Sequence, residues 1–523
     1  MPENTGTWLR DRRVVVAGGG TAGQSAARHL LALQAQVRIA DDRVVGTDAA
    51  AIAGADVLAA AGARFVAIAD LLADPDWVAG TDLVVVSPGF APTHRLPAQA
   101  VAADVPVWGE VELAWRLDVD GVYGPPRTWL VVTGTNGKTT TTSMLTEIVT
   151  AAGRAAAACG NIGLPVLDAM AEQPRVDVLC AELSSFQLYW APSLAPAAGV
   201  VLNVADDHLD WHGSFAAYAA AKQVALHGAV GVVGLDDEVA AGLPVAGRRV
   251  GFTLAEPAAG QLGIRDGRLS DRAFGAADGV ALAFAAGIHP AGPSGIADAL
   301  AAAALARAIG IEPADVASAL SAFRPAAHRG EVVARIDGID FVDDSKATNP
   351  HAAQAAVAAH RRVVLIAGGL LKGASLDPML AAVAARLAGV VAIGRDRGLV
   401  VEAIARHAPE VPTVTVFTGD DGVVTALREL PAPSGALPAP APAPVDGDPA
   451  VAVMDRAVAV AWELACAGAD RPDAVLLAPA AASLDMFAGY GRRGDAFAAA
   501  AGALAAARDV PPDRTAGEQA HRP

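Results

Sequence analysis

The sequence predicts an α/β protein of three domains with mainly parallel sheets, and three observations lead to this prediction. The chain has 523 residues, whereas a single domain usually holds about 100–200. Short β-branched runs alternate with alanine-rich helical patterns near both ends of the chain, an order typical of a parallel, doubly wound sheet. A glycine-containing turn follows a buried strand and opens a helix at Gly18–Gly23 and again at Gly134–Gly137, as in folds that bind nucleotides.

The first domain is defined by alternating strands and helices. The expected elements are, in chain order, a strand at Val14–Ala17, a helix at Gln24–Leu33, and strands at Gln36–Asp41 and Leu83–Gly89. The turn-rich segment Val119–Arg127 then interrupts the pattern. We therefore expect an N-terminal Rossmann-like domain over residues 1–127.

Two further domains are expected after this segment. A new strand at Thr128–Gly134 opens a central P-loop ATPase domain over residues 128–327, with a mainly parallel sheet. A C-terminal Rossmann-like α/β domain is expected over residues 328–523, because strand patterns recur at Val363–Gly369, Val390–Gly394, Thr413–Phe417 and Ala474–Pro479. Residues 431–449 are rich in proline and alanine and predict a flexible insertion. The polar tail from Asp509 onward is predicted to be frayed.

Composition and charge exclude several classes of protein. The net charge is −17 and the pI is near 5.0, whereas nucleic-acid binding depends on Lys and Arg that release counterions. We expect no nucleic-acid partner, although a local basic pocket can still bind a small anion. The three cysteines, Cys159, Cys180 and Cys466, have neither metal-ligand nor disulfide spacing. No apolar run reaches the ~18 residues that cross a membrane, and no signal segment is recognised, so a soluble cytoplasmic protein is predicted.

The sharpest functional signal is the segment VVTGTNGKTTTTSML, Val131–Leu145. A strand leads into a glycine turn and a helix start, where backbone N–H groups and the helix dipole bind phosphate. Lys138 is placed to reach the β- and γ-phosphates, and the Thr139 hydroxyl to ligate Mg²⁺. The spacing departs from the usual G-x-x-x-x-G-K-[ST], because Gly134 precedes Gly137 by only three positions. The predicted ATP-binding residues are Gly134, Thr135, Asn136, Gly137, Lys138, Thr139 and Thr140.

The loop GTNGKTT resembles the phosphate loop of the Mur ligase family and of the related folylpolyglutamate synthetases. Two later segments are similar to further blocks of the family: AELSSFQL holds Glu182, and NVADDHLDWHGSFAAYAAAKQ holds His208 and Lys222. Taken alone, a helical lysine and a single histidine are more often solvated or structural. The resemblance implies two Mg²⁺ sites with Thr139, Glu182, His208 and a carbamylated Lys222 as ligands. It also makes Lys138, His208 and Lys222 the candidate catalytic residues.

The turn Gly18–Gly23 has the G-x-G-x-x-G pattern, and Asp41 and Asp42 follow near the offset of a ribose-binding acid. By itself this pattern indicates NAD binding, whereas in Mur ligases a similar pattern holds a UDP-sugar. The segments SPG, at Ser87–Gly89, and GNIGLP, at Gly160–Pro165, resemble the family's contacts to the same substrate. The UDP-substrate residues implied are Gly20, Thr21, Asp42, Arg43, Ser87, Pro88, Gly89 and Asn161.

Three blocks of the third domain resemble the family members that add D-glutamate. They are DDSKATNP at Asp343–Pro350, GGLLKGASL at Gly368–Leu376, and APAAASLDMFAGYGRRGDAF at Ala478–Phe497. Asp343 stands where those members have asparagine. Cations and hydroxyls suit the carboxylates of glutamate, and the amino-acid-binding residues implied are Lys346, Thr348, Lys372, Ser483, Leu484 and Tyr490. The segment HRGE, His328–Glu331, resembles the family hinge, which adds Arg329 and Asp344 to the ATP site.

The resemblance implies an ATP-dependent ligase that adds D-glutamate to UDP-N-acetylmuramoyl-L-alanine through an acyl phosphate, in peptidoglycan precursor synthesis. It also implies a monomer without membrane contact. Three alternatives stay open: a relative that adds L-glutamate or another acidic amino acid, a folylpolyglutamate synthetase-like ligase, and an NAD-binding oxidoreductase. Folate ligases begin with the ATPase domain, so the N-terminal domain argues against that alternative. The set of Lys138, Thr139 and Glu182 argues against the oxidoreductase.

Overall fold

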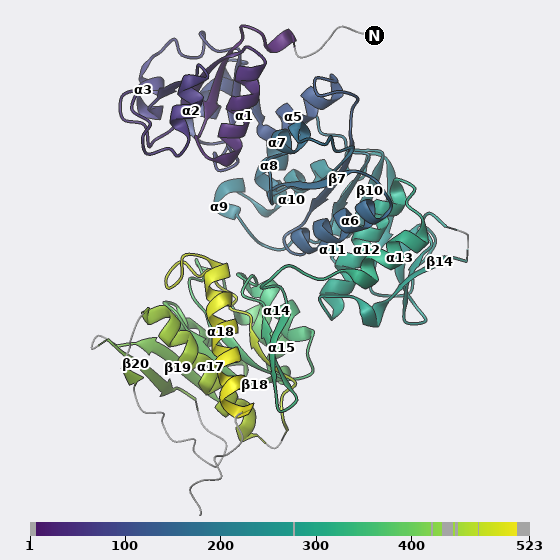
Figure 1. Cartoon of the computed structure of the whole chain (residues 1–523), viewed down its shortest axis with the longest axis vertical. Helices are drawn as coiled ribbons and strands as arrows, with labels where there is room; N and C mark the ends of the chain where they lie inside the picture. The colour runs from purple at the N-terminus through teal and green to yellow at the C-terminus, as the bar shows by residue number, and fades with distance from the viewer. Residues whose placement is uncertain are drawn as a thin grey trace, which may run out of the picture. The chain divides into compact units, whose positions relative to one another are not determined.

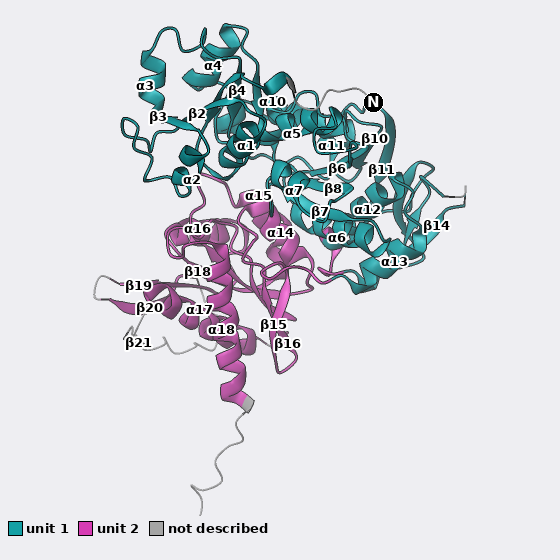
Figure 2. Ribbon diagram, turned by 45° about the horizontal axis from the view of Figure 1, so that its top comes forward, with its two compact units in different colours: residues 1–288, 295–323 teal, residues 289–294, 324–523 magenta. Residues whose placement is uncertain are grey.

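A computed structural model describes residues 7–275, 278–419, 422–430, 443–444, 448–468 and 470–509. The chain forms two compact units (Figure 2). Unit 1 comprises Met1–Ile288 and Gly295–Phe323, and unit 2 comprises His289–Ser294 and Arg324–Pro523. Unit 1 contains two sheets and unit 2 contains one. The domain boundaries expected at 127/128 and 327/328 stay predictions.

The N-terminal sheet of unit 1 is parallel throughout, in the order β3-β2-β1-β4-β5. Its strands are β1 Arg13–Ala17, β2 Gln36–Ala40, β3 Arg64–Val66, β4 Leu83–Val86 and β5 Val107–Gly109. The helices are α1 Thr21–Ala32, α2 Ala55–Ala60, α3 Ile68–Ala73, α4 Arg95–Ala102 and α5 Glu110–Val119. Strand β4 is buried along its whole length, as expected for a parallel strand covered on both faces. The doubly wound fold predicted for this region is confirmed.

The second sheet of unit 1 has the order β14-β13-β12-β11-β10-β9-β6-β8-β7 and is parallel from β7 to β12. Its strands are β6 Thr128–Thr133, β7 Ala156–Gly160, β8 Val178–Glu182, β9 Ala198–Val201, β10 Val230–Gly234, β11 Arg248–Phe252, β12 Gln261–Arg265, β13 Arg268–Asp271 and β14 Val280–Phe284. The helices are α6 Lys138–Ala151, α7 Val166–Ala171, α8 Ser185–Tyr189, α9 Leu209–His212, α10 Phe215–Gln223, α11 Glu238–Gly242, α12 Pro293–Ala308 and α13 Pro313–Ala322. The antiparallel edge formed by β12, β13 and β14 was not among the predicted elements.

Unit 2 has one sheet, in the order β15-β16-β22-β17-β18-β19-β20-β21. Its strands are β15 Glu331–Ile336, β16 Ile339–Asp343, β17 Val363–Gly368, β18 Leu387–Ile393, β19 Thr413–Thr418, β20 Val423–Arg428, β21 Ala443–Pro444 and β22 Ala474–Leu477. The helices are α14 Pro350–Ala358, α15 Asp377–Val383, α16 Arg397–His407, α17 Pro449–Ala467 and α18 Tyr490–Asp509. The strands from β16 to β19 are parallel neighbours, which confirms the expected α/β class.

One hydrophobic core runs through both sheets of unit 1. It joins Leu30 and Leu117, on helices of the N-terminal region, to Trp129 of β6 and Leu167 of α7. Figure 1 shows α1, α5 and α7 where the two sheets approach each other. The connection between the sheets is itself anchored, because the buried Arg127 side chain is paired with a carboxylate. Unit 1 is therefore held together by packing rather than by a loose linker.

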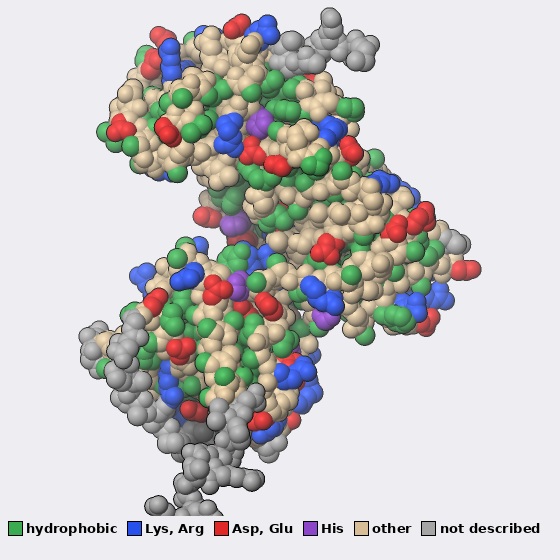
Figure 3. Space-filling view, viewed as in Figure 1, with side chains coloured by type: hydrophobic (Ala, Val, Ile, Leu, Met, Phe, Trp, Pro, Cys, Tyr) green, Lys and Arg blue, Asp and Glu red, His purple; other side chains and the backbone are tan. Residues whose placement is uncertain are grey.

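Some sequence predictions fall on parts of the chain that the structure does not describe. Most of the predicted 431–449 insertion lies outside the described residues, and so does the tail after Asp509. Within the described part of the chain, no helix has the length and apolar character of a membrane span. On the face drawn in Figure 3, the coloured Lys and Arg side chains are interspersed with Asp and Glu, without a continuous basic surface.

Candidate active site

The phosphate loop joins β6 to α6, and Gly137 is the N-cap of the helix at φ +84°. A Cβ on Gly137 would lie 2.3 Å from Asp298 Oδ1, so both the backbone conformation and the buried neighbour require glycine. Asp298 also accepts a hydrogen bond from Thr141 Oγ1 at 3.1 Å. Of the predicted ATP-site residues here, Gly134, Thr135 and Thr140 are buried, and Asn136, Gly137, Lys138 and Thr139 are half-buried. The loop thus lies at the N-terminus of a long helix, where anions bind.

Two lysine side chains donate hydrogen bonds to the carbonyl oxygen of Gly134. Lys138 Nζ donates to Gly134 O and to Thr135 O, both at 2.9 Å. Lys222, on α10, is only 2% exposed, and its Nζ donates to Gly134 O at 2.8 Å. Burial lowers the pKa of Lys222 well below its usual value, and the nearby charge of Lys138 lowers it further. The neutral amine form of Lys222 is therefore accessible.

Asn203, which follows β9, holds the phosphate loop from the other side. Its Oδ1 accepts from the backbone N–H groups of Thr135 at 3.1 Å and Asn136 at 2.9 Å. Its Nδ2 donates to Asn136 O at 3.2 Å. The Thr135 hydroxyl lies 2.9 Å from the Tyr218 hydroxyl. Asn203 was not among the residues predicted from the sequence, although it is the first residue of the block that contains His208.

Glu182 ends β8 beside the phosphate loop, because β8 pairs with β6 in the parallel sheet. Its side chain is buried, and Oε1 accepts from Asn161 Nδ2 at 2.8 Å. Among the described residues, Oε2 is buried without a hydrogen-bond partner. Burying an unsatisfied carboxylate oxygen is costly unless a cation or proton satisfies it. Glu182 therefore fits a metal ligand, and Asn161 links it to the predicted UDP-substrate loop.

His208 lies just before α9 at φ +54°, with about half of its side chain exposed. Burial lowers the pKa of His208, while Asp207 opposes that shift and Lys222 adds to it. In the part of the chain that the structure covers, no group of three or more His, Cys, Asp or Glu side chains could hold a metal ion. A metal beside Glu182 therefore needs oxygen from another source, such as the Thr139 hydroxyl, phosphate, or a carboxylate formed on Lys222.

The first glycine turn is built around Asp41. Gly18 has φ +94°, and a Cβ on Gly23 would lie 1.9 Å from Gly18 O, so the turn requires glycine at both places. Asp41 Oδ2 accepts from Gly19 N at 2.7 Å, and Arg43 donates to Oδ1 and Oδ2 at 2.8 Å each. The Arg43 guanidinium holds the pKa of Asp41 far below its usual range. Asp42, the acid predicted to contact substrate, is exposed beside this pair.

The predicted UDP-substrate residues of the N-terminal region gather at one edge of its sheet. Strands β1 and β4 are parallel neighbours, so the turns that follow them meet, and Ser87 Oγ donates to Gly18 O at 3.2 Å. Gly20, Thr21 and Gly89 are exposed, and Pro88 is half-buried. Open α/β sheets bind ligands at this edge, outside the carboxyl ends of strands where the strand order reverses. The central strand β1 is such a point.

Unit 2 brings its three blocks together at the carboxyl ends of neighbouring parallel strands β16, β22 and β17. The loops after these strands are joined by backbone hydrogen bonds from Asp344 N to Leu477 O, from Gly368 N to Pro479 O, and from Ala480 N to Ala347 O. Segments that are far apart in the sequence therefore form one edge of the sheet.

The predicted amino-acid-binding residues differ in exposure. Lys346 Nζ lies 3.8 Å from the centroid of the Tyr490 ring, a cation–π contact. Ser483 is buried, Thr348 is half-buried, and Lys372, Leu484 and Tyr490 are exposed. Near the same edge, burial raises the pKa of Asp344 to about 7, and the charge of Arg329 opposes that shift. The two residues predicted to add to the ATP site thus interact with each other.

Arg493, which was not among the residues predicted from the sequence, joins two of these loops. It is 1% exposed, and its Nε and Nη2 donate to Ser345 Oγ at 3.0 Å and Ser345 O at 2.9 Å. Its Nη1 donates to Ala481 O at 3.1 Å. The block Ala478–Phe497 contains this arginine, but the sequence alone does not show that its side chain is buried.

Solved structures with the same fold are distant in sequence. The MurF ligase of Thermotoga maritima in complex with ADP matches with a TM-score of 0.52 and 14% identity, over 97% of this chain and 100% of that one. A pseudomurein peptide ligase type C from Methanothermus fervidus matches with a TM-score of 0.50 and 16% identity, over 89% and 96%. These matches establish the fold.

Family models match three segments of the chain, and curated relatives match nearly all of it. The matches are Mur ligase MurD-like, N-terminal domain, at residues 12–109; Mur ligase middle domain, at 132–254; and Mur ligase, glutamate ligase domain, at 328–481. UDP-N-acetylmuramoylalanine--D-glutamate ligases of Rhodococcus jostii and Mycolicibacterium smegmatis are each 55% identical. The first match covers 95% of this chain and 96% of the relative, the second 96% and 99%. The chain therefore belongs to the Mur ligase family.

Proposed function

We propose that this chain is an ATP-dependent ligase that joins D-glutamate to UDP-N-acetylmuramoyl-L-alanine, a step of peptidoglycan precursor synthesis. The observation that carries the proposal is the identity of 55% to curated relatives named for this activity, over nearly their whole length. The match of residues 328–481 to a glutamate ligase domain supports the choice of amino acid.

We assign the triphosphate of ATP to the start of α6. The N–H groups of Thr135 and Asn136 donate to Asn203, so the positive end of the helix and the Lys138 ammonium are the groups that favour an anion there. Lys138 Nζ lies at the loop itself, on the carbonyls of Gly134 and Thr135. Arg329 and Asp344 of unit 2 are assigned to the same nucleotide by the family resemblance.

We assign Mg²⁺ to the neighbourhood of Glu182 and Thr139, with a second ion near His208 and Lys222. The unpartnered, buried Oε2 of Glu182 supports the first site, and Mg²⁺ commonly uses one or two carboxylates together with substrate phosphates. Bound there, the metal supplies charge neutralisation on the transferring phosphoryl group.

Lys222 is the residue proposed to become carbamylated. Its neutral amine adds to CO₂, which forms an N–C bond, and loss of a proton leaves a carboxylate. The burial that lowers the pKa of Lys222 favours the reactive neutral amine. The modification removes one of the two positive charges beside Gly134 O, and the remaining carbamate N–H can still donate to that oxygen.

The remaining substrates are assigned by class. The UDP-sugar belongs to the turns after β1 and β4 and to the loop containing Asn161. The D-glutamate carboxylates belong to the polar residues of unit 2, with Lys346 and Lys372 as the cations and Thr348 and Ser483 as the hydroxyl donors. Leu484 and Tyr490 are assigned to the apolar walls of the same site.

The reaction then has two steps. An oxygen of the L-alanine carboxylate attacks the γ-phosphorus, the bond to the leaving ADP breaks, and an acyl phosphate forms. The D-glutamate amine attacks the acyl carbon, the bond to phosphate breaks, and the nitrogen loses a proton as the amide forms. Lys138 stabilises the negative charge of the transferring group by its position. His208 is assigned to metal binding rather than proton transfer.

We also propose that the enzyme acts as a monomer in the cytoplasm, as the family resemblance implies. Light scattering on the purified chain tests the first part, and a mass near 52.5 kDa is the expected result. A stable dimer would contradict it.

Phosphate release measured with ATP, Mg²⁺ and UDP-N-acetylmuramoyl-L-alanine tests the function. D-glutamate, L-glutamate, meso-diaminopimelate and L-lysine are supplied separately, and only D-glutamate is expected to stimulate release. Stimulation by L-glutamate would instead identify a ligase of different stereochemistry. Release with none of the four would overturn the proposal.

A further inference from the structure

Helix α7 connects the two parts of the proposed UDP-substrate site. It begins at Val166, directly after the Gly160–Pro165 loop that contains Asn161. It packs against α1, and α1 begins directly after the turn that contains Gly20. Figure 1 shows α1 and α7 together in unit 1. Contacts between these helices therefore fix one substrate loop relative to the other.

Asp168 of α7 is the main polar contact between the two helices. Its carboxylate accepts from Ser25 Oγ at 2.8 Å, and from Arg28 Nη2 at 2.7 Å. His29 Nε2 lies 3.0 Å from the same carboxylate, and His29 Nδ1 lies 2.5 Å from the Tyr123 hydroxyl. Three residues of one face of α1 thus converge on one side chain about 140 positions later in the sequence.

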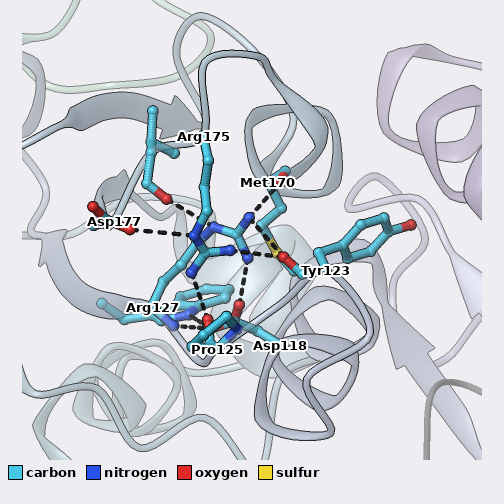
Figure 4. A network of polar contacts seen from close by, with 9 residues as sticks. Asp118, Tyr123, Pro125, Arg127, Met170, Arg175 and Asp177 are labelled. Carbon is cyan, nitrogen blue, oxygen red and sulfur yellow. Dashed lines mark hydrogen bonds and ion pairs between the residues drawn. The ribbon is translucent and has the colours of Figure 1, made fainter.

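The two ends of α7 are held as well. At its start, Leu167 N donates to Glu110 Oε1, on α5, at 2.7 Å. In its last turn, Met170 O accepts from Arg127 Nη2 at 2.6 Å. Figure 4 shows Arg127 between Met170 and Asp118. Arg127 Nη1 donates to Asp118 Oδ1 at 2.7 Å. A helix of six residues is marginal by itself, so these contacts determine where it lies.

We propose that Asp168 is a positioning residue for the UDP-substrate site. It sets the Gly160–Pro165 loop in register with the turns after β1 and β4, so that both halves of the site are formed before substrate binds. A preformed site avoids the entropic cost of ordering its loops on binding. The identity of the substrate in this inference rests on the proposed function. The predicted ordering of the Gly160–Pro165 loop by Asp168 does not depend on that identity.

Steady-state kinetics on the full chain test the role. In Asp168→Asn, the KM for UDP-N-acetylmuramoyl-L-alanine is expected to rise about tenfold, which is the effect of about one charge-assisted hydrogen bond. The KM values for ATP and D-glutamate are expected to stay within about twofold. Ser25→Ala removes one donor and leaves the carboxylate, so a smaller rise in the same KM is expected. Asp168→Glu, which retains the charge, is expected to recover part of the loss.

Asp82→Asn is the matched control. Asp82 also accepts from a backbone N–H and an arginine side chain in the same region, both from Arg13, but these contacts do not involve α7. Wild-type KM values are expected for this variant. An unchanged KM for the UDP-sugar in both Asp168→Asn and Ser25→Ala would overturn the proposal. A parallel rise of all three KM values would also overturn it, because the effect would then not be specific to the UDP-substrate site.

Hydrogen exchange separates this inference from the proposed function, since it needs no substrate. Backbone amides of residues 160–164 are expected to exchange faster in Asp168→Asn than in Asp82→Asn. Equal exchange in the two variants would refute the positioning role. If the wild type does not turn over the UDP-sugar while the exchange difference is present, the proposed function fails and the role of Asp168 in ordering the loop stands.

Discussion

Replacement of Gly137 by alanine tests the construction of the phosphate loop. The residue has φ +84°, and forcing an L-residue into the left-handed region costs about 1–2 kcal/mol. The new Cβ would lie 2.3 Å from Asp298 Oδ1 and 3.2 Å from Leu202 Cδ1. Asp298 must therefore move, which weakens its 3.1 Å bond with Thr141, a loss of about 1.5–3 kcal/mol for a bond to a charged group. The free energy of unfolding is expected to fall by about 2.5–5 kcal/mol.

Gly153 is the matched control at the other end of the same helix. It has φ +78°, and no atom lies within 4 Å of the Cβ that alanine would add. Gly153→Ala therefore pays the backbone strain alone, about 1–2 kcal/mol. Urea unfolding followed by circular dichroism compares the two variants, and Gly137→Ala is expected to be less stable by about 1.5–3 kcal/mol.

ATP binding gives a second comparison, since only Gly137 lies at the end of α6 that we assign to the triphosphate of ATP. The Kd for ATP, measured by calorimetry, is expected to rise about tenfold or more in Gly137→Ala and to stay close to wild type in Gly153→Ala. Equal loss of stability and equal ATP affinity in the two variants would refute the assignment of the Asp298 contact to this loop.

Three further predictions follow from buried charges. Asp118→Asn leaves the buried Arg127 without its carboxylate and is expected to lower the free energy of unfolding by about 3–5 kcal/mol. The control Asp470→Asn removes an exposed ion pair and should lower the free energy of unfolding by no more than about 1 kcal/mol. Equal losses in the two variants, measured by urea unfolding, would contradict the stabilising role of the buried Asp118–Arg127 pair. Burial raises the pKa of Glu110 from its ordinary 4.5 to about 7. Between these two pH values the native state therefore binds more protons than the unfolded state. The free energy of unfolding is expected to fall as pH rises through that interval. Glu110→Gln should make that fall smaller when unfolding is measured at pH 5 and pH 8, while Asp344, whose pKa is also raised to about 7, still contributes to it. An unchanged pH dependence would show that Glu110 does not cause it. Lys222→Arg retains a cation but lacks the amine that is proposed to form the carbamate, so turnover should drop at least about 100-fold. Wild-type turnover should also fall in CO₂-depleted buffer and recover with bicarbonate. Turnover that is insensitive to both changes would exclude the carbamate.

The sequence predicted the parallel sheets well, because their strands are short β-branched runs followed by turns. The strand expected at Val363–Gly369 differs from β17 by a single residue. The β12–β14 edge was missed, since its strands mix glycine, arginine and apolar residues without a clear period. Local pattern therefore predicted the buried centre of each sheet better than its exposed edge.

The site was harder to predict because its supporting residues act across the fold. Asn203 bonds to a loop 67 positions earlier, and Arg493 to a residue 148 positions earlier, and no local pattern indicates such contacts. The sequence also could not decide which of two adjacent acids, Asp41 or Asp42, faces the glycine turn. The structure places Asp41 there, with Gly19 and Arg43 bonded to it.

The central claim is ligation of D-glutamate through an acyl phosphate, and an oxygen-isotope experiment tests it most directly. UDP-N-acetylmuramoyl-L-alanine labelled with ¹⁸O in its terminal carboxylate is incubated with enzyme, ATP, Mg²⁺ and D-glutamate. Mass spectrometry is expected to find one ¹⁸O in the released phosphate and a product heavier by one glutamyl residue. Product without ¹⁸O in the phosphate would contradict the acyl phosphate route, and labelled phosphate without that product would contradict the ligation of D-glutamate.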